Sequence, residues 1–158
     1  MSGSLTNQFL TFMLGSETYG IEITRIREIL VYPSVTSLPN TQHWVKGVIN
    51  LRGEVTPIID LRIRFNTTEN PLYTSTTIVI AVKTNDGRML GLVVDNVSDV
   101  ETIDYDKLLP APDMGSSISA EYLKGLIKKD ERMVIILDTE RILDKKELDA
   151  LAEITTKG

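Results

Sequence analysis

The 158-residue sequence contains no cysteine and one histidine. Without cysteine there can be no disulfide, thiolate nucleophile, iron–sulfur cluster or cysteine zinc site. The single histidine, His43, cannot build a multi-histidine metal site, and it precedes Trp44 in a connecting segment. Neither a Gly-x-Ser-x-Gly nucleophile motif nor a phosphate-binding glycine loop occurs. We therefore expect no enzyme activity, no metal and no cofactor.

The sequence also lacks a basic excess and any long apolar run. It carries 17 Lys and Arg against 22 Asp and Glu, for a net charge of -5, and only 6% of its residues are aromatic. Proteins that bind nucleic acid or anionic membranes rely on basic side chains, often with interleaved aromatics. No stretch approaches the roughly 20 apolar residues of a membrane-spanning helix, and the N-terminus does not resemble a signal peptide. We expect a cytoplasmic protein that binds no nucleic acid and does not insert into a membrane.

The sequence does contain many short apolar, β-branched runs separated by turn residues. The Asp86-Gly87 pair is the clearest hairpin signal, because glycine tolerates the positive φ of a tight turn. Pro57 has no N–H to donate, so its position is expected at a strand edge or a bulge. Runs of about five residues at this spacing predict an all-β barrel or sandwich; they are 9–14, 19–23, 45–49, 55–61, 77–82, 89–94 and 133–137.

Helix is predicted in two places only. Ile23, Ile26 and Ile29 are spaced by three, which suits one helical turn after the 19–23 strand. Asp144 and Glu147 have the spacing of a capping box, and apolar residues recur after them. This pattern predicts a short C-terminal amphipathic helix over about 144–156.

An internal repeat organises the chain. The motif at 46–49 recurs at 124–127, an offset of 78, and the motif at 20–23 recurs at 91–94, an offset of 71. Each half would be a unit of about 70 residues, near the size at which a lone core is marginal. Two similar barrels packed together would remove that weakness.

Several side chains have both a functional and a plain structural interpretation. Arg52, beside the Gly53 turn, could donate to carboxylates or backbone carbonyls of a partner, or could simply be solvated. Asp60 and Arg62 are two residues apart, so on a strand they would share a face as a surface ion pair. The aliphatic residues at equivalent repeat positions could line a groove between the barrels or belong to their cores.

Motifs along nearly the whole chain, from about Gln8 to Leu151, resemble the CheW family of bacterial chemotaxis coupling proteins. The stretches that carry the resemblance are 19–23, 46–53, 57–62, 91–100, 110–112 and 121–125. The resemblance implies a mainly β fold of two SH3-like five-stranded β-barrels packed together, with a short C-terminal helix. We accordingly expect a single CheW-like domain over 1–158. Its expected parts are a first barrel at 15–80, a second barrel at 81–143 with strand 9–14, and the helix at 144–156.

The same resemblance implies a non-catalytic adaptor that couples methyl-accepting chemoreceptors to the histidine kinase CheA. The partners would be the receptor's cytoplasmic tip and the kinase's regulatory domain, in receptor arrays at the inner membrane. The alternative is a CheW-like regulatory module of a larger chemotaxis signalling protein. Carried over by position, the residues that would contact the receptor are Ile23, Ile26, Glu28, Asn50, Arg52, Val97 and Val100. Those that would contact the kinase are Leu109 and Met114.

Overall fold

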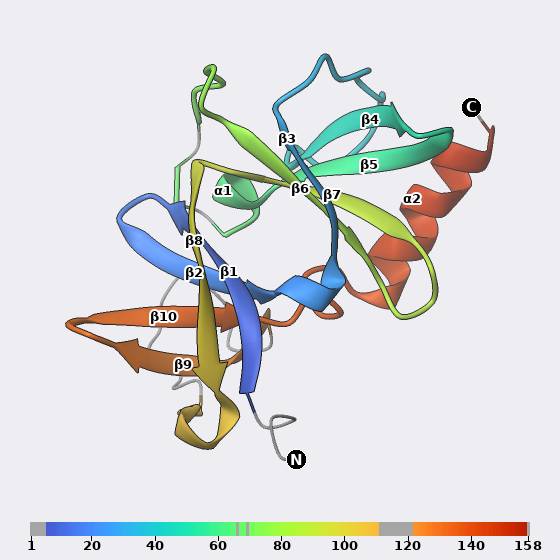
Figure 1. The fold of residues 1–158 in the computed structure, drawn as a ribbon. Helices are drawn as coiled ribbons and strands as arrows, with labels where there is room; N and C mark the ends of the chain where they lie inside the picture. Colours follow the sequence, from blue (N-terminus) through green and yellow to red (C-terminus); the bar gives the residue numbers. More distant parts are fainter. Residues whose placement is uncertain (1–5, 66, 69, 111–121, 158) are drawn as a thin grey trace.

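Two five-stranded sheets make up most of the computed structural model, which describes residues 6–65, 67, 68, 70–110 and 122–157 (Figure 1). We call the first sheet barrel A; its strand order is β8-β1-β2-β10-β9. The second, barrel B, has the order β3-β6-β7-β5-β4. The strands of barrel A are β1 (Thr6–Leu14), β2 (Glu17–Glu22), β8 (Asn96–Asp104), β9 (Leu123–Lys129) and β10 (Arg132–Leu137). Those of barrel B are β3 (Ile26–Val31), β4 (Val45–Leu51), β5 (Glu54–Asp60), β6 (Ile78–Lys83) and β7 (Met89–Val94).

Each sheet closes on itself through the segment that follows one edge strand, β3 in barrel B and β8 in barrel A. Thr36 pairs with Val48 of β4 in barrel B, and Leu109 pairs with Leu126 of β9 in barrel A. The two bridges are equivalent in the repeat, because Val48 and Leu126 are 78 residues apart. The predicted fold class, mainly β with two packed five-stranded barrels and a C-terminal helix, is confirmed.

The repeat is present, but the predicted boundaries between the barrels are wrong. Strand β2 lies within the expected first barrel, 15–80, yet it pairs in parallel with β10 of barrel A. Strand β7 lies within the expected second barrel, 81–143, yet it pairs in parallel with β5 of barrel B. Each barrel thus combines a hairpin from one half of the repeat with three strands from the other half. Figure 1 shows this exchange, with the blue β1 and β2 beside the orange β9 and β10.

The short elements match the sequence in part. The C-terminal helix α2 (Lys145–Lys157) begins with the predicted capping box. The Glu147 N–H donates to Asp144 Oδ1 at 2.7 Å, and the Asp144 N–H donates to Glu147 Oε1 at 2.9 Å. The expected helical turn at 23–29 is limited to the 3-10 helix η2 (Ile23–Arg25), because the chain continues as β3. Pro57 pairs with Val48 of β4, and the pairing of β5 with β7 begins only at the next residue.

The largest apolar core lies between the barrels rather than inside either one. It combines buried side chains from β1 and β2 of barrel A with others from β5, β6 and β7 of barrel B. A ladder of stacked rings crosses it, with centroid separations of 6.0, 6.2 and 5.4 Å between successive members: Phe12, Tyr19, Phe65 and Tyr122. The interiors of the barrels hold smaller clusters, Phe9, Ile103, Ile127, Val134 and Ile136 in barrel A and Ile58, Val79 and Val93 in barrel B. Because most apolar burial is shared, the two barrels stabilise each other.

The expected surface ion pair of Asp60 and Arg62 is a buried one. Both side chains are almost fully buried, and Arg62 Nη2 lies 2.9 Å from Asp60 Oδ2. The chain leaves β5 at Asp60 and forms the one-turn helix α1 (Leu61–Arg64), which Asp60 caps by accepting the Arg62 N–H. The prediction was wrong because it assumed that the strand continued through Arg62.

Tyr19 in the inter-barrel core provides a test of this packing. Its hydroxyl is buried without a hydrogen-bond partner among the described residues, and burial raises the pKa of the phenol to about 12. Removing an unpartnered buried hydroxyl avoids its desolvation cost, so Tyr19→Phe should leave the free energy of unfolding unchanged or raise it by about 1 kcal/mol. Tyr19→Ala should lower it by about 3–5 kcal/mol, because it leaves a cavity. Urea unfolding measures both; a clear loss of stability in Tyr19→Phe would show that the hydroxyl has a partner.

Candidate functional site

The first strand of barrel B presents two aliphatic side chains toward the inter-barrel region. Ile26 pairs with Val82 and Ile29 pairs with Ile80, and the register shifts between Ile26 and Glu28. In a regular strand, residues three apart point to opposite faces. The extra residue of the β-bulge instead places Ile26 and Ile29 on the face that carries Val82 and Ile80, both in the inter-barrel core.

The edge strand β8 of barrel A, the repeat counterpart of β3, shows the same arrangement. Val97 pairs with Phe12 and Val100 pairs with Leu10, and the register shifts between Thr11 and Phe12. Phe12 and Leu10 belong to the inter-barrel core, so Val97 and Val100 share its face. The spacing of three therefore reflects a β-bulge in both strands rather than a helix.

We call Ile26, Ile29, Val97 and Val100 the inter-barrel aliphatic surface. Ile26 and Val97 are half-buried and pack against the inter-barrel core, whereas Ile29 and Val100 are 45% and 43% exposed. The core interpretation therefore applies to Ile26 and Val97, and the surface interpretation applies to Ile29 and Val100. Sequence reasoning missed Ile29 as a site residue, although the repeat that aligns Ile29 with Val100 could have identified it.

Ile23 lies where the chain crosses from barrel A to barrel B; the return crossing is between β7 and β8. It is the first residue of η2, which joins β2 of barrel A to β3 of barrel B, and it is half-buried. Glu22, just before it, contacts Lys124 of β9. Although burial alone would raise the pKa of the Glu22 carboxyl, the hydrogen bond and charge of Lys124 lower it overall. Glu22 is therefore held as a carboxylate beside the crossing.

The structure brings Glu28, Asn50 and Arg52 together. Arg52 stands in the turn between β4 and β5 with a φ of 53°, and Asn50 Oδ1 stabilises this turn by accepting the Gly53 N–H at 2.8 Å. Arg52 Nε donates to Glu28 Oε1 at 2.8 Å, while the Arg52 side chain is 81% exposed. Glu28 lies opposite Ala81, so it points to the other face of β3 from Ile26 and Ile29. The polar group and the inter-barrel aliphatic surface therefore share the edge strand β3 but lie on its two faces.

Of the two residues expected to contact the kinase, the structure places one. Leu109 lies in the segment that closes barrel A, where its N–H and carbonyl both pair with Leu126, and its side chain is 49% exposed. Met114 lies outside the described residues. The close packing of this segment on β9 is permitted by Gly125, where a Cβ would lie 2.3 Å from the Leu109 carbonyl oxygen.

The described part of the chain presents exposed apolar and charged side chains. Within it, no group of three or more His, Cys, Asp or Glu side chains is arranged to hold a metal ion. No helix among these residues is both long and apolar enough to cross a membrane. What the geometry supplies is one exposed aliphatic side chain on each barrel beside a shared core, with an exposed guanidinium paired to Glu28 on the other face of β3. Such a combination is suited to binding another protein.

Comparison with protein families adds an independent line of evidence. Residues 8–147 match a family model described as CheW-like domain. The chain is 43% identical over 151 residues to the chemotaxis protein CheW of Klebsiella aerogenes, which covers 96% of this chain and 89% of that protein. It is 32% identical over 152 residues to the chemotaxis protein CheW of Treponema pallidum, covering 93% and 88%.

A solved structure shares the fold. The crystal structure of the scaffolding protein TtCheW from Thermoanaerobacter tengcongensis superposes with a TM-score of 0.80 at 30% identity. The superposition covers 89% of this chain and 90% of that chain. The similarity therefore includes both barrels.

Proposed function

Because the chain belongs to the CheW family of chemotaxis scaffold proteins, we propose that it is a non-catalytic adaptor that joins methyl-accepting chemoreceptors to the histidine kinase CheA. The observation that carries the proposal is the inter-barrel aliphatic surface, whose exposed members come from equivalent strands of the two barrels. A protein of this kind acts by holding two partners at once, so it needs two separate surfaces and no reactive group.

The inter-barrel aliphatic surface is proposed to bind the receptor. The cytoplasmic tip of a chemoreceptor is a helical hairpin, and a helix binds in a groove through apolar side chains spaced by three or four residues. Ile29 and Val100 are exposed enough to contact such side chains, while Ile26 and Val97 anchor the same two strands to the inter-barrel core. Ile23 extends the apolar region at the crossing between the barrels.

Arg52 is proposed to set the register of the bound helix. A guanidinium has five N–H donors, and the bond to Glu28 uses Nε alone among the contacts of the described residues. The Nη groups of this exposed side chain can therefore donate to a carboxylate or a helix-end carbonyl of the receptor. Glu28 and Asn50 act by holding Arg52 and its turn in place.

The kinase is proposed to bind at the end of barrel A, through Leu109 and Met114. Leu109 is an exposed apolar residue on a segment whose backbone is fixed by β9, which makes it a suitable anchor for a protein partner. The partner is expected to be the regulatory domain of CheA. Binding to both partners would place the protein in receptor arrays at the cytoplasmic face of the inner membrane.

Charge reversal at Arg52 tests the receptor surface. Arg52→Glu should lower retention of the chain on an immobilised receptor fragment at least fivefold. The substitution removes the guanidinium donor, and the new carboxylate is repelled by that of Glu28. An exposed ion pair contributes only about 0–1 kcal/mol, so the midpoint of urea unfolding and retention on CheA should not change. Pull-down on each partner and unfolding by circular dichroism measure these effects.

Arg141→Glu is the matched control, since it reverses an exposed arginine that pairs with Asp138 beside α2. It should bind the receptor fragment like wild type. Equal retention of Arg52→Glu and wild type would remove Arg52 from the receptor surface. A wild-type chain that is retained by neither partner would contradict the adaptor function itself.

A further inference from the structure

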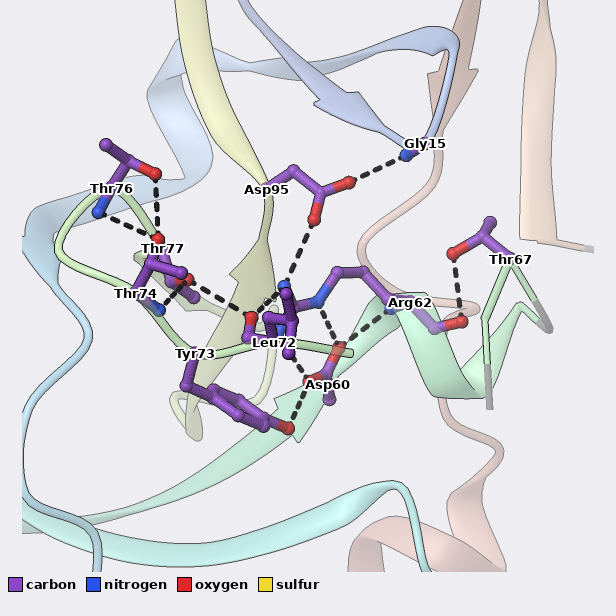
Figure 2. Close-up of polar contacts among 10 residues, drawn as sticks. All are labelled: Gly15, Asp60, Arg62, Thr67, Leu72, Tyr73, Thr74, Thr76, Thr77 and Asp95. Atoms are coloured by element: carbon purple, nitrogen blue, oxygen red, sulfur yellow. Dashed lines mark hydrogen bonds and ion pairs between the residues drawn. The ribbon is translucent and has the colours of Figure 1, made fainter. Parts of the chain in front are cut away.

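Arg62 is the centre of a buried polar network beside the junction of the barrels (Figure 2). Its Nε and Nη2 donate to the two oxygens of Asp60 at 3.0 and 2.9 Å, a bidentate arrangement that fixes the guanidinium plane. Its Nη1 donates to the Leu72 carbonyl oxygen at 2.9 Å. Tyr73 also donates its hydroxyl to Asp60. All four of these residues belong to barrel B and its loops.

The network reaches the other barrel through Asp95. This residue lies between the end of β7 and the start of β8, where the chain passes from barrel B to barrel A. Arg62 Nη1 lies 3.1 Å from Asp95 Oδ1, and the Gly15 N–H in the β1–β2 turn of barrel A donates to Asp95 Oδ2 at 2.7 Å. The Asp95 N–H in turn donates to the Met13 carbonyl oxygen at 3.1 Å. One carboxylate therefore connects a fixed cation of barrel B to a backbone turn of barrel A.

The charge of Arg62 is strongly maintained in this setting. Burial alone would lower the pKa of the guanidinium, but the hydrogen bonds and charge of Asp60, and after them those of Asp95, raise it above its usual value. Breaking the buried Asp60–Arg62 pair would leave an uncompensated charge, so Asp60 holds the guanidinium in place. Asp95, whose side chain is 34% exposed, therefore accepts from a cation whose position Asp60 already fixes.

The inter-barrel aliphatic surface begins directly after this contact. Val97 is two residues beyond Asp95, and Val100 follows on the same strand. Their counterparts, Ile26 and Ile29, belong to barrel B. The distance of Val97 and Val100 from Ile26 and Ile29 therefore depends on the direction in which β8 extends from Asp95.

We propose that Asp95 and Arg62 are positioning residues for the receptor surface: their ion pair fixes the orientation of barrel A against barrel B and so sets the spacing between Val97 and Val100 on one side and Ile26 and Ile29 on the other. This inference rests on the proposed receptor-binding function. Neither residue is required to touch the receptor; they act through the placement of β8.

Asp95→Asn tests the inference with little change in shape. Arg62 and Gly15 donate to different oxygens of Asp95, and the amide replaces one of these oxygens with an NH2 donor, so one of the two contacts is lost and Arg62 loses the negative charge beside it. Asp86→Asn is the matched control, because Asp86 pairs with Arg88 at 3.0 Å within barrel B alone. Since the chain has no cysteine, Glu54→Cys and Lys128→Cys introduce the only two thiols, one exposed on each barrel. Spin labels at these two positions report the distance between the barrels by pulsed electron paramagnetic resonance.

We expect Asp95→Asn to broaden or shift the distance distribution and to weaken binding of a receptor tip fragment about tenfold. Binding to CheA should stay within twofold of wild type, since its proposed site lies within barrel A. Asp86→Asn should match wild type in all three measurements. The distance is measured without any partner, so an unchanged distribution in Asp95→Asn overturns the inference even if the receptor assignment is wrong. An equal loss of binding to both partners would also overturn it, because that result indicates general destabilisation.

Discussion

Gly47→Ala is expected to remove a large part of the stability of the protein. Gly47 has a φ of 140°, and a Cβ at this position would lie 2.0 Å from the Thr36 carbonyl oxygen. That oxygen accepts the Val48 N–H at 2.9 Å in the bridge that closes barrel B, so it cannot move without opening the barrel. Overpacking and an unfavourable φ each cost about 1–3 kcal/mol, so their sum of about 2–6 kcal/mol is a large fraction of the roughly 5–15 kcal/mol that stabilises an ordinary domain.

Gly53→Ala is the matched control for this change. Gly53 also has a positive φ, of 86°, but a Cβ there would have nothing within 4 Å. Its substitution should cost only the backbone strain, about 1–2 kcal/mol. Urea unfolding followed by circular dichroism compares the two. If Gly47→Ala unfolds at the same urea concentration as Gly53→Ala, the close approach of Thr36 to β4 is not as the structure describes.

Val100→Asp is expected to weaken binding to the receptor at least about 30-fold while the protein stays folded. Val100 is substantially exposed on β8, so a carboxylate there remains solvated in the free protein. In the complex it would be buried against apolar side chains of the receptor helix, beside Asp99 and Glu101. Loss of a central apolar contact costs about 2 kcal/mol or more, which corresponds to at least about 30-fold in affinity. Isothermal titration calorimetry with a receptor tip fragment measures the change.

Met133→Asp is the matched control, because Met133 is 38% exposed on β10, a strand that contributes nothing to the inter-barrel aliphatic surface or to the Arg52 turn. It should bind the receptor fragment with wild-type affinity. Val97→Asp cannot replace Val100→Asp in this experiment, since Val97 packs against the inter-barrel core and its substitution would also affect folding. Wild-type affinity in Val100→Asp would exclude β8 from the receptor surface.

Local features of the fold were predictable because they depend on neighbouring residues. The hairpin at Asn85-Asp86-Gly87 joins β6 to β7, and the capping box of Asp144 and Glu147 starts α2. The repeat correctly identified which strands are equivalent. It could not identify which copy of a hairpin pairs with which set of three strands, since equivalent strands carry similar apolar patterns and satisfy either pairing. The exchange of hairpins between the barrels is therefore a tertiary result.

The candidate site was predictable in composition and less so in geometry. Ile26 and Val97 were identified, but a spacing of three was interpreted as helical because a β-bulge leaves no distinct signature in a single sequence. Asp60 and Arg62 were expected at the surface, because nothing local shows that α1 starts at Leu61 or that Asp95, at the crossing between the barrels, comes close to Arg62. Glu28 and Arg52 lie 24 residues apart in sequence and meet only through barrel closure.

Co-sedimentation measures directly whether this one chain joins the two partners. Vesicles that display the cytoplasmic tip of a chemoreceptor are mixed with CheA from the same organism, with and without the chain, and then pelleted. We predict that CheA appears in the pellet only when the chain is present, and that substitution of Val100 by Asp returns it to the supernatant. If the amount of CheA in the pellet is the same with and without the chain, the adaptor function is contradicted.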